Sequence, residues 1–259
     1  MQTSMLKKIL HIVAFLFFIL VTYFAMQACG FKVEALQKGI KDGLFFLTEM
    51  FPPNWTDFKS MVDPALETLA LAILGTLLGS ALSFIIALFA ASNLSNKWTN
   101  LFVRSFISIE RSIPELFILL ILIAAYGLGA LSAILALMIG CIGMLGKLFS
   151  DAIEETPTSL IESMKASGAS KIQIIYYGIL PDVFPKLISY ALFRLEINIR
   201  LSVMLGAIGA GGIGFELDYA FSVLLYNRAL SSLIMVLILV IGIEQLSAYI
   251  RKRLSINQI

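Results

Sequence analysis

Apolar residues gather in six long runs along the chain, and short polar stretches separate these runs. A run of about 20 apolar residues can cross a bilayer as an α-helix, because a helix pairs its own backbone groups inside the hydrocarbon. The pattern therefore predicts an all-α integral membrane protein with about six transmembrane helices. The runs cover residues 9–28, 66–91, 106–126, 129–149, 183–208 and 229–250.

Composition supports a lipid environment and excludes several functional classes. The chain is 59% hydrophobic and only 14% charged, which is too little charge for the surface of a soluble domain of 259 residues. A net charge of +2 gives no indication of a nucleic-acid partner. One histidine and two cysteines without metal-ligand spacing predict no metal site. The chain also lacks the G-x-S-x-G motif of a serine hydrolase, so we expect no enzyme activity in it.

Lysine and arginine near the helix ends predict the orientation in the membrane, because short cytoplasmic loops carry an excess of these residues. Both termini are expected in the cytoplasm. The first outer loop has four lysines against this rule, and its segment 34–51 has the helical periodicity of a helix along the membrane surface. The residues expected on the inner side are Lys7, Lys8, Lys97, Arg104, Lys147, Lys165, Lys171, Arg251, Lys252 and Arg253.

One glycine-rich segment has the spacing of a nucleotide-binding turn. Gly209-x-Gly211-x-x-Gly214 matches the dinucleotide fingerprint, which needs a β-strand before it and an acidic residue about 20 residues later. Here residues 192–205 belong to a membrane run, and Glu216 follows too closely. The chain also lacks a P-loop. We therefore expect no phosphate cradle in this chain, so any ATP that drives it must be held by another subunit.

Four polar residues, Arg194, Glu196, Asn198 and Arg200, fall within the fifth apolar run. A charge inside a membrane costs about 2.5–3.5 kcal/mol on insertion scales, so these side chains should face protein or water. At about 100° per residue, Arg194 and Asn198 share one helix face. Glu196 and Arg200 share another and have the favourable order for an ion pair. Two hypotheses remain: an ion pair that holds the bundle or dimer together, or arginines that attract a passing anion.

The long loop 150–182 should contain two short helices. Thr156-Pro157 can open a helix over residues 158–167, which Gly168 ends. A second helix is expected from about Ser170 until Pro181 stops it. Two short helices that meet at a glycine predict a compact knob on the cytoplasmic side.

This loop resembles the cytoplasmic signature loop of the permease subunits of ABC importers. The shared run is Glu162-x5-Gly168-x11-Leu180-Pro181. In that family the loop sits in a groove of a separate ATPase subunit and transmits its closure to the membrane helices. The resemblance implies ATPase contacts at Glu162, Ala166, Gly168 and Ala169. The chain departs from the family pattern at Ser163 and Met164, which stand in place of alanines, and at Gly178, which stands in place of the usual isoleucine.

A narrower resemblance, over about residues 51–250, is to the phosphonate-import permeases. Members of that class handle phosphonates, phosphite or related phosphorus oxyanions, so the resemblance implies import of such an anion (phosphonate, phosphite or phosphate). The alternatives are an ABC permease for another small solute, such as an amino acid, and an ion-coupled secondary transporter. The similar motifs are Phe51-Pro52-Pro53-Asn54-Trp55, Arg111-Ser112-Ile113-Pro114-Glu115-Leu116, Tyr190-x-x-x-Arg194-x-Glu196-Ile197-Asn198-x-Arg200 and Gly209-Ala210-Gly211-Gly212-Ile213-Gly214-x-Glu216-Leu217.

Two clusters of residues each have two interpretations of their role. Glu110-Arg111 and Glu115 flank Pro114 at the start of the third run, where they either mark the membrane boundary or form a gate on the cytoplasmic side. Glycines at the outer end of the fifth run permit either a re-entrant turn that acts as an outer gate or close helix packing. These glycines are Gly209, Gly211, Gly212 and Gly214.

The resemblance also implies an assembly in a bacterial cytoplasmic (inner) membrane. Two permease copies, most simply a homodimer, enclose one pathway with alternating access. Two ATPase subunits hold ATP and Mg²⁺, so this chain has no cofactor of its own, and an extracytoplasmic binding protein delivers the anion. The chain then divides into an anchor helix and outer loop (1–65), a type I permease domain (66–250) with its coupling loop (150–182), and a cytoplasmic tail (251–259).

Overall fold

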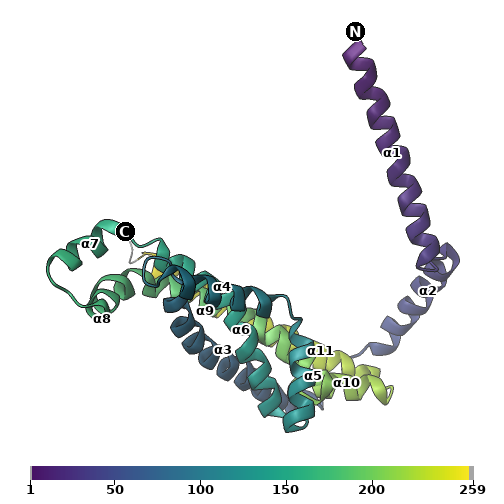
Figure 1. The fold of residues 1–259 in the computed structure, drawn as a ribbon. Helices are drawn as coiled ribbons and strands as arrows, with labels where there is room; N and C mark the ends of the chain where they lie inside the picture. Colours follow the sequence, from purple (N-terminus) through teal and green to yellow (C-terminus); the bar gives the residue numbers. More distant parts are fainter. Residues whose placement is uncertain (1, 257–259) are drawn as a thin grey trace. The chain divides into compact units, whose positions relative to one another are not determined.

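The computed structural model describes residues 2–256 and divides into two compact units, with the division between Phe51 and Pro52 (Figure 1). Every regular element in the described range is a helix. The predicted all-α class is therefore confirmed.

The first unit contains two helices, α1 (Gln2–Ala28) and α2 (Val33–Met50). The side chains of Lys7–Ala28 are all exposed, and that stretch is strongly apolar on every side. A helix that is hydrophobic all round suits a lipid surrounding. The short turn between the helices uses Gly30 at φ +63°, a left-handed conformation that glycine adopts without strain.

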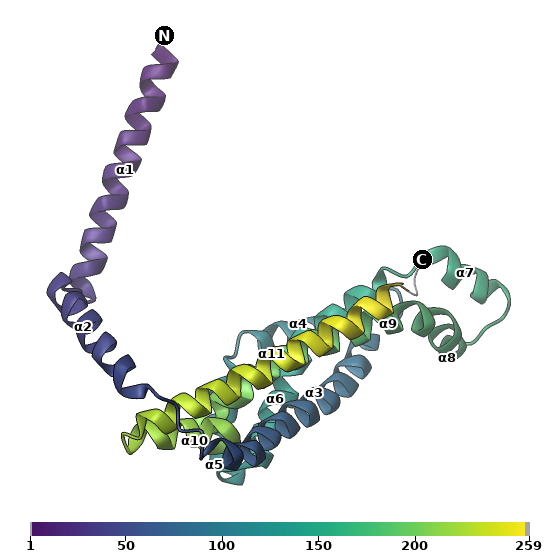
Figure 2. The same cartoon turned by 180° about the vertical axis from the view of Figure 1, so that it is seen from behind.

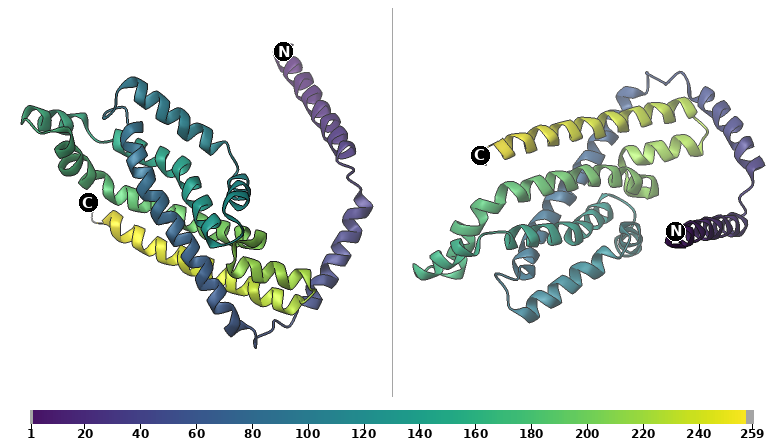
Figure 3. Two further views of the ribbon diagram at one scale, coloured as in Figure 1. Left: turned by 60° about the horizontal axis from the view of Figure 1, so that its bottom comes forward. Right: turned by 90° about the horizontal axis from the view of Figure 1, so that it is seen from above.

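The second unit is a bundle around four long helices that run side by side (Figures 2 and 3). The helices α3 and α6 approach each other most closely where glycines remove side-chain bulk. A Cβ atom at Gly75 would lie only 2.6 Å from the Cβ of Leu137, so the small residue is required for this packing. The four helices are α3 (Val62–Ala90), α6 (Ala130–Glu154), α9 (Leu180–Leu205) and α11 (Tyr226–Ile256).

The third apolar run does not form one continuous helix, which corrects the expectation for residues 106–126. Helix α4 (Lys97–Arg111) begins before that run, and α5 (Glu115–Tyr126) completes it. Between them stands Pro114, which has no N–H to donate and therefore favours the start of a new helix over the continuation of the old one. The run is thus divided into two half-helices.

Four helices in the described part of the chain are long and apolar enough to cross a membrane: α1, α3 with the 3₁₀ turn η1 (Phe58–Met61) before it, α6 and α11. A fifth crossing arises where α9 and the helix after it form one bent span. The remaining predicted crossing falls on the half-helices α4 and α5. Length and composition therefore support a multi-pass membrane protein.

The glycine-rich segment bends the chain at the end of α9. A π-helical turn, η3 (Gly206–Ala210), follows α9, and α10 (Gly212–Ser222) leaves at 57°. Gly209, Gly211 and Gly212 have φ angles of +101°, +93° and +72°, a region where side chains with a Cβ are strained. The bend is that of a broken span or a re-entrant turn.

The loop between α6 and α9 forms a knob, defined here as residues 158–179, at one end of the bundle (Figures 1 and 2). It consists of α7 (Thr158–Ala166), the short α8 (Lys171–Gln173) and a π-helix, η2 (Ile174–Ile179). The predicted end of α7 at Gly168 is confirmed by its φ of +81°. The predicted stop at Pro181 is wrong, because η2 continues directly into α9 and Pro181 lies in the first turn of α9, where no N–H is needed.

Candidate functional site

The knob is attached to the bundle by a shared apolar core. Ile161 of α7 and Ile174 and Ile179 of η2 are buried in one cluster with Phe149 and Ile153 of α6. Because α9 begins where η2 ends, a force on the knob reaches α9 through continuous backbone as well as through this core. The knob is therefore mechanically part of the bundle and not a loose loop.

The other side of the knob is open. Of the four residues expected at an ATPase contact, Glu162, Ala166 and Gly168 are exposed and Ala169 is half-buried. The turn that presents them is rigid, because Ser170 and Gln173 form a reciprocal capping box at the start of α8. This face is available for a partner.

Two departures from the family pattern compensate each other in space. Met164 is larger than the alanine of the pattern, and Gly178 is smaller than the isoleucine. A Cβ at Gly178 would lie 2.5 Å from the Sδ of Met164, so the methionine side chain occupies the space that the glycine leaves. The knob keeps its packing although both positions differ.

A buried ion pair joins α9 to the break between the half-helices. Arg194 Nη2 lies 2.7 Å from Glu115 Oε1, and the two side chains are only 4% and 23% exposed. Gly140 of α6 makes room for this pair, since a Cβ there would lie 2.8 Å from the carboxyl carbon of Glu115 and 2.9 Å from Arg194 Nη2. Glu115, one of the residues predicted to form a gate on the cytoplasmic side, thus pairs with Arg194 inside the bundle.

A second acidic side chain, from α4, packs against α6 one helical turn beyond Gly140. Glu110 of α4 is buried against Gly143, where an added Cβ would overlap its carboxylate. Arg111, the other gate candidate, is itself exposed, although its Cγ lies close to the same glycine. Arg111 is therefore exposed, whereas Glu115 is engaged in the pair with Arg194.

Asn198 is completely buried between three helices. Its Nδ2 donates to Thr76 Oγ1 of α3 at 2.8 Å and contacts the thiol of Cys141 of α6 at 3.3 Å. A buried amide that joins α3, α6 and α9 fixes their relative positions. Asn198 is thus a packing residue in this conformation.

Glu196 and Arg200 do not pair with each other, which corrects the hypothesis drawn from their spacing. Glu196 Oε1 lies 2.6 Å from Arg251 Nη1, and Arg200 Nη2 lies 3.6 Å from Glu244 Oε1. Both partners belong to α11. The reason is tertiary: α11 packs along α9 and offers opposite charges that the helical spacing of α9 alone cannot reveal.

The two pairs with α11 differ in exposure. The side chain of Glu196 is 7% exposed, whereas Arg200 and Glu244 are 49% and 50% exposed. Arg200 therefore presents a guanidinium on the surface of this single chain, within the length of a membrane-spanning segment.

The glycine-rich bend is held by two side chains of α3. Glu67 accepts a hydrogen bond from the N–H of Gly212 at 3.0 Å, and Thr68 accepts one from the N–H of Ile213 at 2.9 Å. These are the free donors at the start of α10, where a carboxylate is also favoured by the helix dipole. Gly214 packs so closely on the carbonyl of Val203 that a Cβ would overlap it. The bend is thus a defined contact between α3, α9 and α10.

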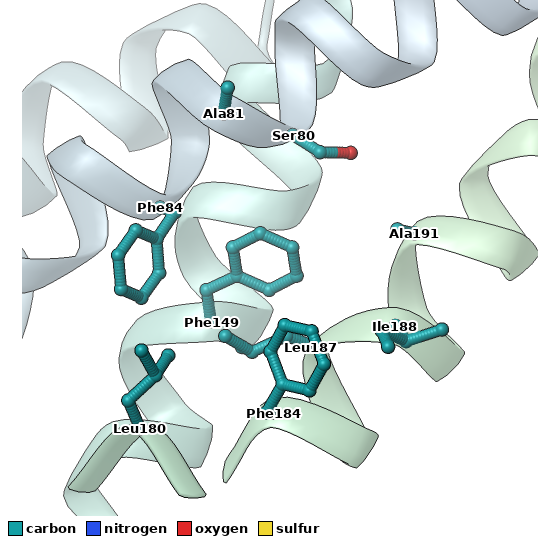
Figure 4. Close-up of a pocket in the computed structure, with 9 residues that line it drawn as sticks. All are labelled: Ser80, Ala81, Phe84, Phe149, Leu180, Phe184, Leu187, Ile188 and Ala191. Carbon is teal, nitrogen blue, oxygen red and sulfur yellow. The ribbon is translucent and has the colours of Figure 1, made fainter. Parts of the chain in front are cut away.

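An open cavity of about 340 Å³ lies between α3, α6 and α9 (Figure 4). Phe84, Phe149 and Phe184 dominate its lining, and Ser80 carries the polar atom among the side chains drawn there. Such a surface lacks the donors that an oxyanion needs. This cavity is not a candidate anion site.

The family described as "binding-protein-dependent transport system inner membrane component" matches residues 83–256. The chain belongs to this family. It is therefore a transport permease and not a catalytic enzyme, with the type I fold of ABC importer permeases.

Three similar proteins agree with this assignment. The permease is 36% identical to the phosphite transport system permease protein of Stutzerimonas stutzeri over 205 residues, which cover 79% of this chain and 74% of that protein. It is also 36% identical to the phosphate-import permease protein of Mycolicibacterium smegmatis over 232 residues, 89% of this chain but 44% of that longer protein. The inward-facing methionine ABC transporter matches with a TM-score of 0.68 at 26% identity, over 78% of this chain and 99% of the matched chain.

Sequence patterns did not identify the side chains that hold the glycine-rich bend or the residues that make room for the buried carboxylates. Glu67 and Thr68 lie at the start of an apolar helix, and no local pattern links them to residues 212–213. The sequence identifies Gly140 and Gly143 as small residues at a helix contact, but it does not show that they make space for the carboxylates of Glu115 and Glu110.

Proposed function

We propose that the permease is the membrane subunit of an ATP-driven importer that passes a phosphonate or a related phosphorus oxyanion, such as phosphite or phosphate, by alternating access. The names of two relatives, a phosphite and a phosphate permease, support this substrate class. The motifs around Pro52, Pro114 and Gly211 support the same assignment.

The observation that carries the proposal is the knob, with one side in the bundle core and the other side open. Two separate ATPase subunits, which hold ATP and Mg²⁺, would contact Glu162, Ala166, Gly168 and Ala169 on the knobs of two permease copies. Closure of the ATPases would move the knobs together and, through η2, move α9. Residues 150–182 would thus act as the coupling loop of a permease domain that spans residues 66–250.

The two arginines of α9 have different parts in this proposal. Arg194 is buried in its pair with Glu115 and would hold the bundle together. Arg200 is half-exposed, and a guanidinium that faced lipid would be costly, so its surface would face a water-filled pathway or the second copy. Its planar donors suit the oxygens of a passing oxyanion.

The remaining elements complete the assembly. A homodimer would enclose one pathway, with both termini and the knob in the cytoplasm of a bacterium. The bend at Gly209–Gly214 would lie at the outer end, beneath an extracytoplasmic binding protein, and would serve as the outer gate. The half-helix break near Arg111 would lie near the middle of the bundle, because it packs against Gly140 and Gly143 in the middle of α6.

A transport assay tests the substrate class. The permease is co-purified with its ATPase, reconstituted in vesicles with the binding protein, and supplied with methylphosphonate, phosphite, phosphate or methionine. We expect stimulation of ATP hydrolysis and uptake with a phosphorus oxyanion. Stimulation by methionine alone would favour the amino-acid alternative, for which the methionine transporter match speaks. Uptake that needs an ion gradient and no ATP would favour a secondary transporter.

Substitution of Gly168 tests the coupling. Its φ of +81° excludes proline, whose ring fixes φ near −65°. Gly168→Pro should abolish substrate-stimulated ATP hydrolysis and leave membrane insertion intact. The matched control is Gly39→Ala, at a glycine of α2 where an added Cβ meets open space. Normal stimulation in the Gly168 variant would refute the coupling role of the knob.

A further inference from the structure

Helix α2 has two clearly different faces. Projected at 100° per residue, most of its apolar residues cover one half of the helix surface and its charged residues the other, with Phe45 as an exposed apolar exception on the charged half. The apolar side chains are exposed, so the described chain leaves this face largely uncovered. The main members of the apolar face are Leu36, Ile40, Leu44 and Leu47.

Both ends of α2 are tied to the same surface of the membrane. The apolar span of α1 ends at Ala28, only a short turn before α2 begins at Val33. On the other side of α2, the next apolar span begins at Phe58. A chain covers at most about 3.6 Å per residue, so the short connection from Ala28 to Val33 keeps the start of α2 close to the membrane boundary where α1 ends.

The linker that follows α2, residues 51–57, has the composition of a membrane interface. Phe51 and Trp55 are exposed aromatic residues, and Trp in particular is enriched where lipid headgroups meet water. Asn54 ties this linker to the start of α11, because its N–H donates to the carbonyl of Asn227 at 3.3 Å and its carbonyl accepts from Ser231 Oγ at 3.1 Å. The linker is thus anchored at the end of the bundle where α3 begins.

We infer that α2 lies flat in the membrane–water interface, with its apolar face among the acyl chains and its charged face toward water. Its partner is the lipid surface. An apolar face on a surface helix next to a spanning helix is what interfacial binding requires.

Charge composition specifies how α2 binds. Between residues 32 and 50, three lysines are balanced by three carboxylates. Attraction to anionic headgroups would need a net positive face, whereas apolar insertion does not. We therefore expect the same binding in neutral and in anionic membranes.

Site-directed spin labelling of the full-length permease in vesicles tests this inference. In a Cys29→Ser background, single labels are placed on the apolar face at Leu36→Cys and Ile40→Cys. The matched controls are Lys38→Cys and Asp42→Cys, each about 200° away around the helix. The buried Cys141 is left in place, and an unsubstituted Cys29→Ser sample corrects for any label on it.

We expect oxygen, relative to a water-soluble nickel chelate, to collide several-fold more often with labels on the apolar face than with the controls. The difference should be the same in phosphatidylcholine vesicles and in vesicles that also contain phosphatidylglycerol. Equal access of nickel to both faces would place α2 in water and overturn the inference. Protection of the apolar face from both reagents would mean that protein covers it, and a difference that needs phosphatidylglycerol would mean electrostatic attachment; either result also overturns it.

Discussion

Two arginines six residues apart on α9 occupy opposite environments. Arg194 is buried at the break between α4 and α5 and forms a 2.7 Å pair with Glu115. Arg200 is half-exposed and forms a longer, 3.6 Å pair with Glu244. The same residue type in the same apolar run is therefore buried in a helix contact at one position and left half-exposed at another, where we propose that it meets a ligand.

The energetics of the two pairs should differ accordingly. Loss of one partner of a buried pair leaves the other as an uncompensated charge, whereas an exposed pair contributes little to stability. The following variants test whether the buried Arg194 pair and the exposed Arg200 pair differ in this way.

The largest effect is expected for Arg194→Ala, which leaves the Glu115 carboxylate inside the bundle without its partner. Removal of one member of a buried pair costs about 3–5 kcal/mol, enough to unfold many proteins. The yield of purified permease and its thermal midpoint should both fall sharply. Both are measured by size-exclusion chromatography, the midpoint after heating to a series of temperatures. The double variant Arg194→Ala/Glu115→Ala should recover part of the loss. An Arg194→Ala protein as stable as the parent would remove the contrast.

A smaller loss is expected for Gly140→Ala, which changes no charge. The added Cβ would lie 2.8–2.9 Å from atoms of the Arg194–Glu115 pair and force it to move. Overpacking of this kind costs about 1–3 kcal/mol. Gly242→Ala in α11 is the matched control, because a Cβ there meets open space. Equal thermal midpoints for the two variants would show that the pair has room to adjust.

For Arg200→Gln we expect almost no loss of stability, about 0–1 kcal/mol, because the pair is half-exposed. Uptake of the oxyanion should nevertheless fall by at least about tenfold, since a charge-assisted hydrogen bond to the anion is lost. Arg200→Lys should retain part of the uptake. Poor assembly of Arg200→Gln would instead assign Arg200 to the bundle, as for Arg194.

The smallest effect is expected for Glu244→Gln, which removes the countercharge of Arg200. Stability should change by less than about 0.5 kcal/mol. The apparent KM for the oxyanion should fall by up to about fivefold, because Arg200 no longer shares its charge. Glu244→Asp, which keeps the charge, is the control. A higher KM in Glu244→Gln would mean that the glutamate positions Arg200.

The apolar runs made much of the architecture predictable. Runs of about 20 apolar residues have one stable solution in lipid, so the helices α1, α3, α6, α9 and α11 followed from local pattern. The break at Pro114 was not predicted, because apolar residues continue beyond the charged residues that flank it and the whole of 106–126 was assigned to one helix. The knob followed from Pro157 and Gly168, whose backbone preferences act locally.

The sequence by itself determined that this chain is helical, lies in a membrane and carries charges in its fifth apolar run, because hydropathy and glycine or proline conformation are properties of short segments. Only the tertiary structure decided where those charges go. Glu196 pairs with Arg251, Arg200 with Glu244 and Arg194 with Glu115, across separations of 55, 44 and 79 residues. Helical spacing ranks only partners on the same helix, whereas an ion pair forms with whichever opposite charge the packing of another helix brings within reach.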